Sequence, residues 1–200
     1  VCIICWGFQP SMYFIRDEKS PSIGELLEQK ARHDKVKVRV LSWSNDVDVP
    51  VVPGTVGVTG AVGEPNTPGR RDLAIEDKLA GMTDKQFEYN QDWFAQYDAN
   101  TDHYINRTAR GVYRRIADDA SMKNLVFRSR DFSAADRAAI ASHGYLDKGI
   151  SKTTRAVLAG AASQHQKMVL IDHESETNAI GFVMGHNMLD WYWDTNAHAM

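Results

Sequence analysis

The sequence predicts an α/β fold, with a mixed, largely parallel sheet flanked by helices on both faces. Short runs rich in β-branched residues alternate along the chain with segments of helical periodicity. The first strand, helix and second strand follow one another with short connections, which is typical of a βαβ crossover and of parallel strands. The 200 residues are enough for one domain with a sizeable core.

The first three elements are expected within residues 2–43. Residues 2–8 form an apolar run that predicts a buried strand. Ser22 and Glu25 have capping-box spacing, which indicates the start of a helix. That helix places four apolar residues on one stripe: Ile23, Leu26, Leu27 and Ala31. Residues 36–43 alternate valine with basic residues and then become apolar, which predicts a second strand.

A second capping box, Thr83 to Gln86, predicts a further helix. This helix carries an aromatic stripe, which at helical spacing favours core packing: Phe87, Trp93, Phe94 and Tyr97. Residues 124–131 predict a strand, and Ser133 caps a helix that Gly144 ends. Two more strands are expected, one in the motif described below and one at residues 179–184.

Two segments allow a functional as well as a structural interpretation. Residues 45–69 are rich in proline and glycine, which favours a solvated insertion; the alternative is a loop that lines the substrate cleft. A group of four arginines favours a solvated helix face, and contact with anionic headgroups is the alternative: Arg107, Arg110, Arg114 and Arg115.

Composition narrows the class of protein. The net charge of −3 argues against a nucleic-acid binder. No stretch of about 18 apolar residues predicts a membrane span, and no signal peptide is recognisable. Cys2 and Cys5 lie in an apolar run, which favours buried thiols over a redox pair and fits synthesis in a reducing cytoplasm. The histidines lack metal-ligand spacing, so neither a metal nor a cofactor is expected.

The segment from His165 to Asp172 carries the chemistry. His165 and Lys167 are two residues apart and project from the same face of a strand. An imidazole can attack phosphorus or transfer a proton, and a lysine adjoining an apolar run needs an anion. The sequence 185–187 (Gly-His-Asn) follows thirteen residues after Asp172. This arrangement predicts a phosphodiester-cleaving site that contains no metal.

The pattern His165-x-Lys167-x4-Asp172 resembles the HKD signature of the phospholipase D superfamily. Residues 181–195 are similar to the segment that follows this signature in eukaryote-like phospholipases D. Residues 6–12 and 38–43 are similar to phospholipase D effectors that Gram-negative bacteria deliver by type VI secretion. The chain departs from the pattern by containing a single H-x-K-x4-D motif, whereas the family builds one active site from two.

The resemblance implies a phosphohistidine mechanism with defined roles. His165 would attack phosphorus or protonate the leaving oxygen, and the matching histidine would do the other task. Lys167 and Asn187 would hold the non-bridging oxygens, and Asp194 would orient His165. Asp172 falls on the opposite strand face from Lys167 unless a bulge intervenes, which indicates a second-shell or structural role.

The chain is therefore expected to be an N-terminal catalytic half, residues 1–200, of a phospholipase D-like pseudo-dimer. The second half would come from the same polypeptide or from a second subunit. The implied substrate is a glycerophospholipid at a membrane surface, and an immunity protein is a candidate partner; nucleic acid is not expected. The effector would be made in the bacterial cytoplasm, exported without a signal peptide, and act in the target periplasm. A homodimeric nuclease or transphosphatidylase and a non-catalytic fragment are the alternatives.

Overall fold

The computed structural model describes residues 1–17, 19–43, 66–70, 82–99, 107–108, 111–112, 124–142, 149–160, 162 and 164–192. Several expectations lie outside these ranges. They concern most of the proline- and glycine-rich segment, Arg110, Arg114, Arg115, Gly144 and Asp194.

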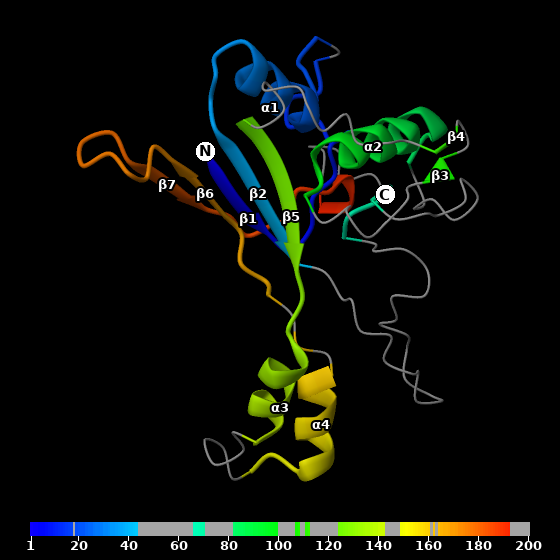
Figure 1. Ribbon diagram of the computed structural model, residues 1–200, viewed down its shortest axis with the longest axis vertical. Coiled ribbons are helices and arrows are strands. Elements are labelled where there is room, and N and C mark those ends of the chain that lie inside the picture. The colour runs from blue at the N-terminus through cyan, green and yellow to red at the C-terminus, as the bar shows by residue number, and fades with distance from the viewer. Residues whose placement is uncertain are drawn as a thin grey trace.

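A five-stranded sheet with the order β5-β2-β1-β6-β7 organises the described residues (Figure 1). Its strands are β1 (Cys2–Cys5), β2 (Val38–Trp43), β5 (Leu125–Arg130), β6 (Met168–Ile171) and β7 (Ile180–Val183). The pairs β1–β2 and β2–β5 are parallel, whereas β1–β6 and β6–β7 are antiparallel. The sheet is therefore mixed, and β6 alone among these five strands runs against the others. Arg107 lies in a separate small sheet of β3 (Arg107–Thr108) and β4 (Gly111–Val112).

The two helices that pack on the sheet start where the sequence predicts. The first, α1 (Ile23–Arg32), follows a capping box in which Ser22 and Glu25 each accept a backbone N–H of the other. The second, α2 (Asp84–Tyr97), begins with the same reciprocal bonds between Thr83 and Gln86. Each box satisfies backbone donors that the first turn of a helix leaves unpaired.

The core lies between these helices and one face of the sheet. Ile3, Val40 and Phe127 occupy equivalent positions on β1, β2 and β5 through the parallel register. All three are buried in the same cluster as Leu27 of α1 and Phe94 of α2. The Phe94 and Phe127 rings meet edge to face, with 5.0 Å between their centroids. The aromatic stripe of α2 is thus core packing, as its spacing predicts.

The expectation of helices on both faces is wrong for the described residues, because α1 and α2 share this one core. The remaining helices, α3 (Ala134–Ser142) and α4 (Lys152–Gly160), pack on each other beyond the end of the sheet (Figure 1). The sequence did not predict α4, since its pattern is weak and Ala159 alone is buried. The βαβ connection β1-α1-β2 with parallel strands is confirmed.

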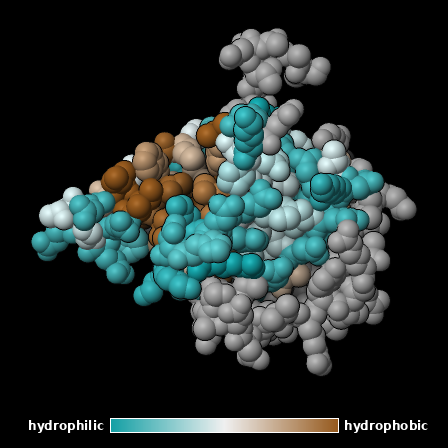
Figure 2. All heavy atoms as spheres, turned by 90° about the horizontal axis from the view of Figure 1, so that it is seen from above, coloured by the Kyte–Doolittle hydropathy of each residue, from teal (hydrophilic) through white to brown (hydrophobic). Residues whose placement is uncertain are grey.

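The hairpin of β6 and β7 extends the sheet beyond the area that the helices cover. All four residues of β7 are exposed, including Phe182 at 51% and Val183 at 85%. Figure 2 shows an apolar region beside the hydrophilic tip on this side of the molecule. β7 is therefore an apolar edge strand, and no described residue covers it.

Candidate functional site

Three of the predicted site residues lie at one end of the sheet. The carboxyl ends of β1, β2, β5 and β7 meet there, together with the amino end of the antiparallel strand β6. His165 and Lys167 immediately precede β6, and Asn187 follows β7. In open α/β sheets, ligands bind at the carboxyl ends of the strands. The topology thus brings His165, Lys167 and Asn187 to the edge where a ligand is expected.

His165 and Lys167 are in direct contact. The Lys167 Nζ lies 3.0 Å from His165 Nδ1 and 3.1 Å from Nε2, and it donates to the His165 carbonyl at 3.2 Å. Lys167 is only 7% exposed, whereas the imidazole is exposed to solvent. The pair therefore presents a ring that substrate can reach, with an ammonium group directly behind it.

The positive charge of the Lys167 ammonium has no negative partner among the described residues. Burial lowers the pKa of Lys167, because it removes the charged form from water. The neighbouring Cys5 stays a neutral thiol, since burial raises its pKa to about 12. No carboxylate in the described part of the chain forms a salt bridge with Lys167. A phosphate oxygen would provide the missing negative charge.

Two tryptophans form the wall behind His165. The Trp6 ring lies edge-on to the imidazole, with 5.9 Å between centroids, and stacks on Trp43 at 5.8 Å and 13°. Asn66 Nδ2 donates to the carbonyls of both tryptophans at 2.7 Å each. One buried amide therefore ties together the ends of β1 and β2. Neither Trp6 nor Asn66 belongs to a local motif, so the sequence alone does not indicate them as site residues.

The segment 66–70 that carries this amide is itself anchored in the core. Arg70 Nε donates to Asp98 Oδ2 at 2.7 Å, and both side chains are 3% exposed. The guanidinium also lies over the Phe127 ring, 5.6 Å from its centroid. A paired and stacked charge of this kind tolerates burial. These contacts hold Asn66 in place against the two tryptophans.

Asn187 is fully buried, at 0% exposure, and neither its Oδ1 nor its Nδ2 has a partner among the described residues. Its neighbour Met188 fixes the backbone, accepting from the Gln9 N–H at 2.9 Å and donating to the Gly7 carbonyl at 3.3 Å. A buried amide without partners costs about 1–3 kcal/mol. Such a group in a folded protein calls for a physical explanation, and a role in binding is one.

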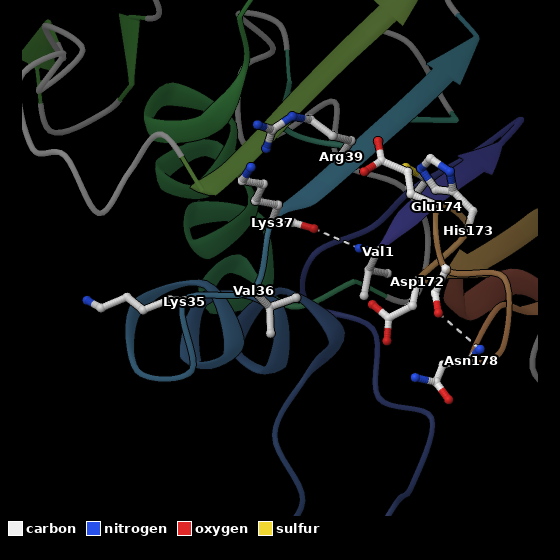
Figure 3. Close-up of a pocket in the computed structure, with 11 residues that line it drawn as sticks. Val1, Lys35, Val36, Lys37, Arg39, Asp172, His173, Glu174 and Asn178 are labelled. Carbon is white, nitrogen blue, oxygen red and sulfur yellow. Dashed lines mark hydrogen bonds between the residues drawn. The ribbon is translucent and has the colours of Figure 1, made fainter.

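Asp172 lies at the opposite end of β6 from this site. At about 3.3 Å per residue along a strand, roughly 16 Å separates its Cα from that of Lys167. It lines a pocket of about 820 Å³ with basic residues on one side and His173 and Glu174 on the other (Figure 3). Its φ of 47° marks a turn residue. Asp172 therefore does not lie beside His165, and its supporting or structural role stays a prediction.

A second pocket, of about 470 Å³, adjoins the candidate site. Its walls are formed by Arg130, Asp131, Phe132, Gln164, His165 and Gln166. The expected contact between Asp194 and His165 stays a prediction, since Asp194 lies outside the described residues.

Three groups at this end of the sheet have the chemistry needed to act on an anion: an exposed imidazole, a buried ammonium beside it and a buried amide without partners among the described residues. Within the described ranges, no group of three or more His, Cys, Asp or Glu side chains is placed to hold a metal ion. None of the helices described is long and apolar enough to span a bilayer. Comparison with protein-family models, with curated proteins and with solved structures finds no match to this chain.

Proposed function

We propose that this chain is one half of a phospholipase D-like enzyme that hydrolyses phosphodiester bonds of glycerophospholipids. The observation that carries the proposal is the contact of Lys167 Nζ with both ring nitrogens of His165, at 3.0 and 3.1 Å. A buried ammonium against an exposed imidazole suits a nucleophile whose target is a phosphate. The unpaired amide of the buried Asn187 adds a second group for phosphate oxygens.

In the proposed reaction, a neutral ring nitrogen of His165 attacks phosphorus and forms a P–N bond. The P–O bond to the leaving group breaks, and an imidazole of the second half donates a proton to the departing oxygen. Water then attacks the phosphohistidine, gives a proton to that second imidazole, and releases phosphatidic acid. Lys167 and Asn187 bind the non-bridging oxygens, whose negative charge grows in the transition state.

The proposal requires a second H-x-K-x4-D motif, from the same polypeptide or from another subunit. The apolar edge strand β7 supports this requirement, because exposed edges are normally paired or covered in a folded protein. The chain would thus form one half of a pseudo-dimer, with the second imidazole facing His165.

The biological setting rests on the sequence resemblance. We place the enzyme among antibacterial effectors that are made in the cytoplasm, exported without a signal peptide and active in the target periplasm. An immunity protein in the producing cell belongs to the same proposal.

The direct test is to trap the covalent intermediate in the full-length protein. Phospholipid vesicles labelled in the phosphate should transfer label to the wild-type chain, and His165→Ala should abolish both label and headgroup release. His173→Ala is the matched control, since this exposed histidine lies at the far end of β6. Turnover should persist in EDTA. The proposal is wrong if His165→Ala and His173→Ala behave alike, or if only single-stranded DNA is cleaved.

A further inference from the structure

The pocket of about 470 Å³ beside His165 lies at the neck between the sheet and the α3–α4 pair. One wall is residues 130–132, where the chain leaves β5 for α3. The other wall is residues 164–166, where the chain returns from α4 to β6. His165 is part of the lining, so the pocket opens directly beside the imidazole.

The one carboxylate of the lining is already neutralised. Asp131 Oδ1 accepts from the Arg137 guanidinium and, at 2.7 Å, from the Phe132 N–H. The two charged side chains are only 9% and 11% exposed. Arg137 also donates to the carbonyls of Ala159 at 2.9 Å and Gly160 at 2.7 Å. This ion pair therefore belongs to the framework of the neck, and it does not offset other charges in the pocket.

Arg130 gives the pocket a positive charge. It is the last residue of β5, it is exposed, and none of the described carboxylates forms a salt bridge with it. Hydrogen bonds from Ser133 and, less strongly, the charge of Arg130 lower the pKa of the nearby Asp136. The Asp136 carboxylate accepts these hydrogen bonds from the Ser133 hydroxyl at 2.7 Å and from the Ser133 N–H at 2.9 Å. The amides of Gln164 and Gln166 supply further donors on the facing wall.

We propose that this pocket binds a second anionic group of the substrate, a carboxylate or a phosphate, next to the phosphodiester that His165 attacks. The location of the scissile diester rests on the proposed function. Charge-assisted hydrogen bonds from a guanidinium are stronger than neutral ones and orient planar oxyanions. Arg130 thus selects acidic headgroups over zwitterionic headgroups that lack the extra anion.

Three soluble diesters without acyl chains test this selection free of membrane surface charge. Glycerophosphoethanolamine has no additional anion, glycerophosphoserine adds a carboxylate, and bis(glycerophospho)glycerol adds a phosphate. Binding to the full chain is followed through the NMR signals of His165, and turnover is assayed separately. At least one acidic ligand should bind roughly tenfold more tightly than glycerophosphoethanolamine. The preferred ligand identifies carboxylate or phosphate as the second anion.

Arg130→Gln should reduce the ratio of affinities for the acidic ligand and for glycerophosphoethanolamine to about one, while the affinity for glycerophosphoethanolamine stays the same. Arg128→Gln is the matched control, because Arg128 is exposed on the same strand but does not line the pocket. Equal binding of all three diesters to wild type, or a preference that survives Arg130→Gln, overturns the inference. Selective binding without turnover would support the anion pocket and contradict the proposed hydrolysis, so the two failures are distinguishable.

Discussion

Gln9 and Asp190 hold each other by two hydrogen bonds. Gln9 Nε2 donates to Asp190 Oδ2 at 2.8 Å, and the Asp190 backbone N–H donates to Gln9 Oε1 at 3.1 Å. Gln9 is 2% exposed and follows β1, whereas Asp190 lies three residues beyond Asn187. The amide therefore fixes the segment that carries Asn187 against the first strand of the sheet.

Replacing Gln9 should weaken both the fold and the site. Gln9→Leu leaves the Asp190 N–H and carboxylate without these partners, so the free energy of unfolding should fall by about 2 kcal/mol. Arg16→Gln is the control, because Arg16 reaches the other oxygen of the same carboxylate from an exposed position, at 3.0 Å. The control should change stability by less than about 1 kcal/mol. Urea unfolding measures both, and equal losses would contradict a special role for Gln9.

Asn187 should be more important for activity than for stability. Asn187→Leu removes an amide that lacks partners, so the free energy of unfolding should stay constant or rise by about 1 kcal/mol. Phosphodiester turnover should fall roughly 10²- to 10³-fold, as for the loss of one oxyanion donor. Asn90→Leu is the matched control: this buried amide accepts from the Ser11 N–H at 2.8 Å. That variant should lose about 1–3 kcal/mol of stability.

Lys167→Met should stabilise the protein near neutral pH, by about 1 kcal/mol, and abolish turnover. The pKa of Lys167 is lower in the fold than in the unfolded chain, so folding bears the full cost of its charge below the folded pKa. As pH rises through the folded pKa toward the unfolded value of 10.5, that cost disappears. The advantage of Lys167→Met in urea unfolding should therefore shrink with rising pH. A constant advantage between neutral pH and pH 10 would contradict the argument.

Substitutions of Asp172 should change the stability of the turn after β6 and leave turnover unchanged. Its φ of 47° is accessible to Gly, Asn and Asp but strained for a β-branched residue. Asp172→Val should therefore cost about 1–2 kcal/mol of stability, and Asp172→Gly should be nearly neutral. Neither substitution should slow turnover, since the residue lies at the far end of β6. Melting temperatures and headgroup release on the two variants check both statements.

Asp194 should affect turnover and not stability if it orients the His165 imidazole. Asp194→Asn should keep the melting temperature and slow turnover roughly 10²- to 10⁴-fold. Asp172→Asn is the paired control and should retain turnover. If Asp194→Asn turns over normally while Asp172→Asn is inactive and stable, the roles of the two carboxylates are reversed.

The sequence predicts the elements whose signals are local. Ser22 and Thr83 mark the starts of α1 and α2 because a capping box acts within four residues. The alternation within residues 36–43 likewise predicts β2. The first strand is shorter than expected: it ends at Cys5, and Phe8 instead forms an isolated bridge to Met188.

The features that the sequence does not predict depend on contacts between distant residues. The amide of Asn66 acts on a carbonyl 60 residues away, and no periodicity within either segment indicates this pairing. α1 and α2 pack on the same face of the sheet because residues of both helices belong to one core cluster with Phe127, and no local pattern indicates this packing. Proximity of His165 and Lys167 was predictable from their spacing, whereas the aromatic wall behind them was not.

The position of β6 beside β1 has a consequence for synthesis. Ile3 pairs with Val169, so β1, which is translated well before β6, must wait for its partner strand. Contacts of such long range slow folding and leave apolar edges open in the meantime. Until residues 165–187 have emerged, His165, Lys167 and Asn187 cannot take their places at the end of the sheet. The order of the strands thus delays the assembly of the candidate site until most of the described chain has been translated.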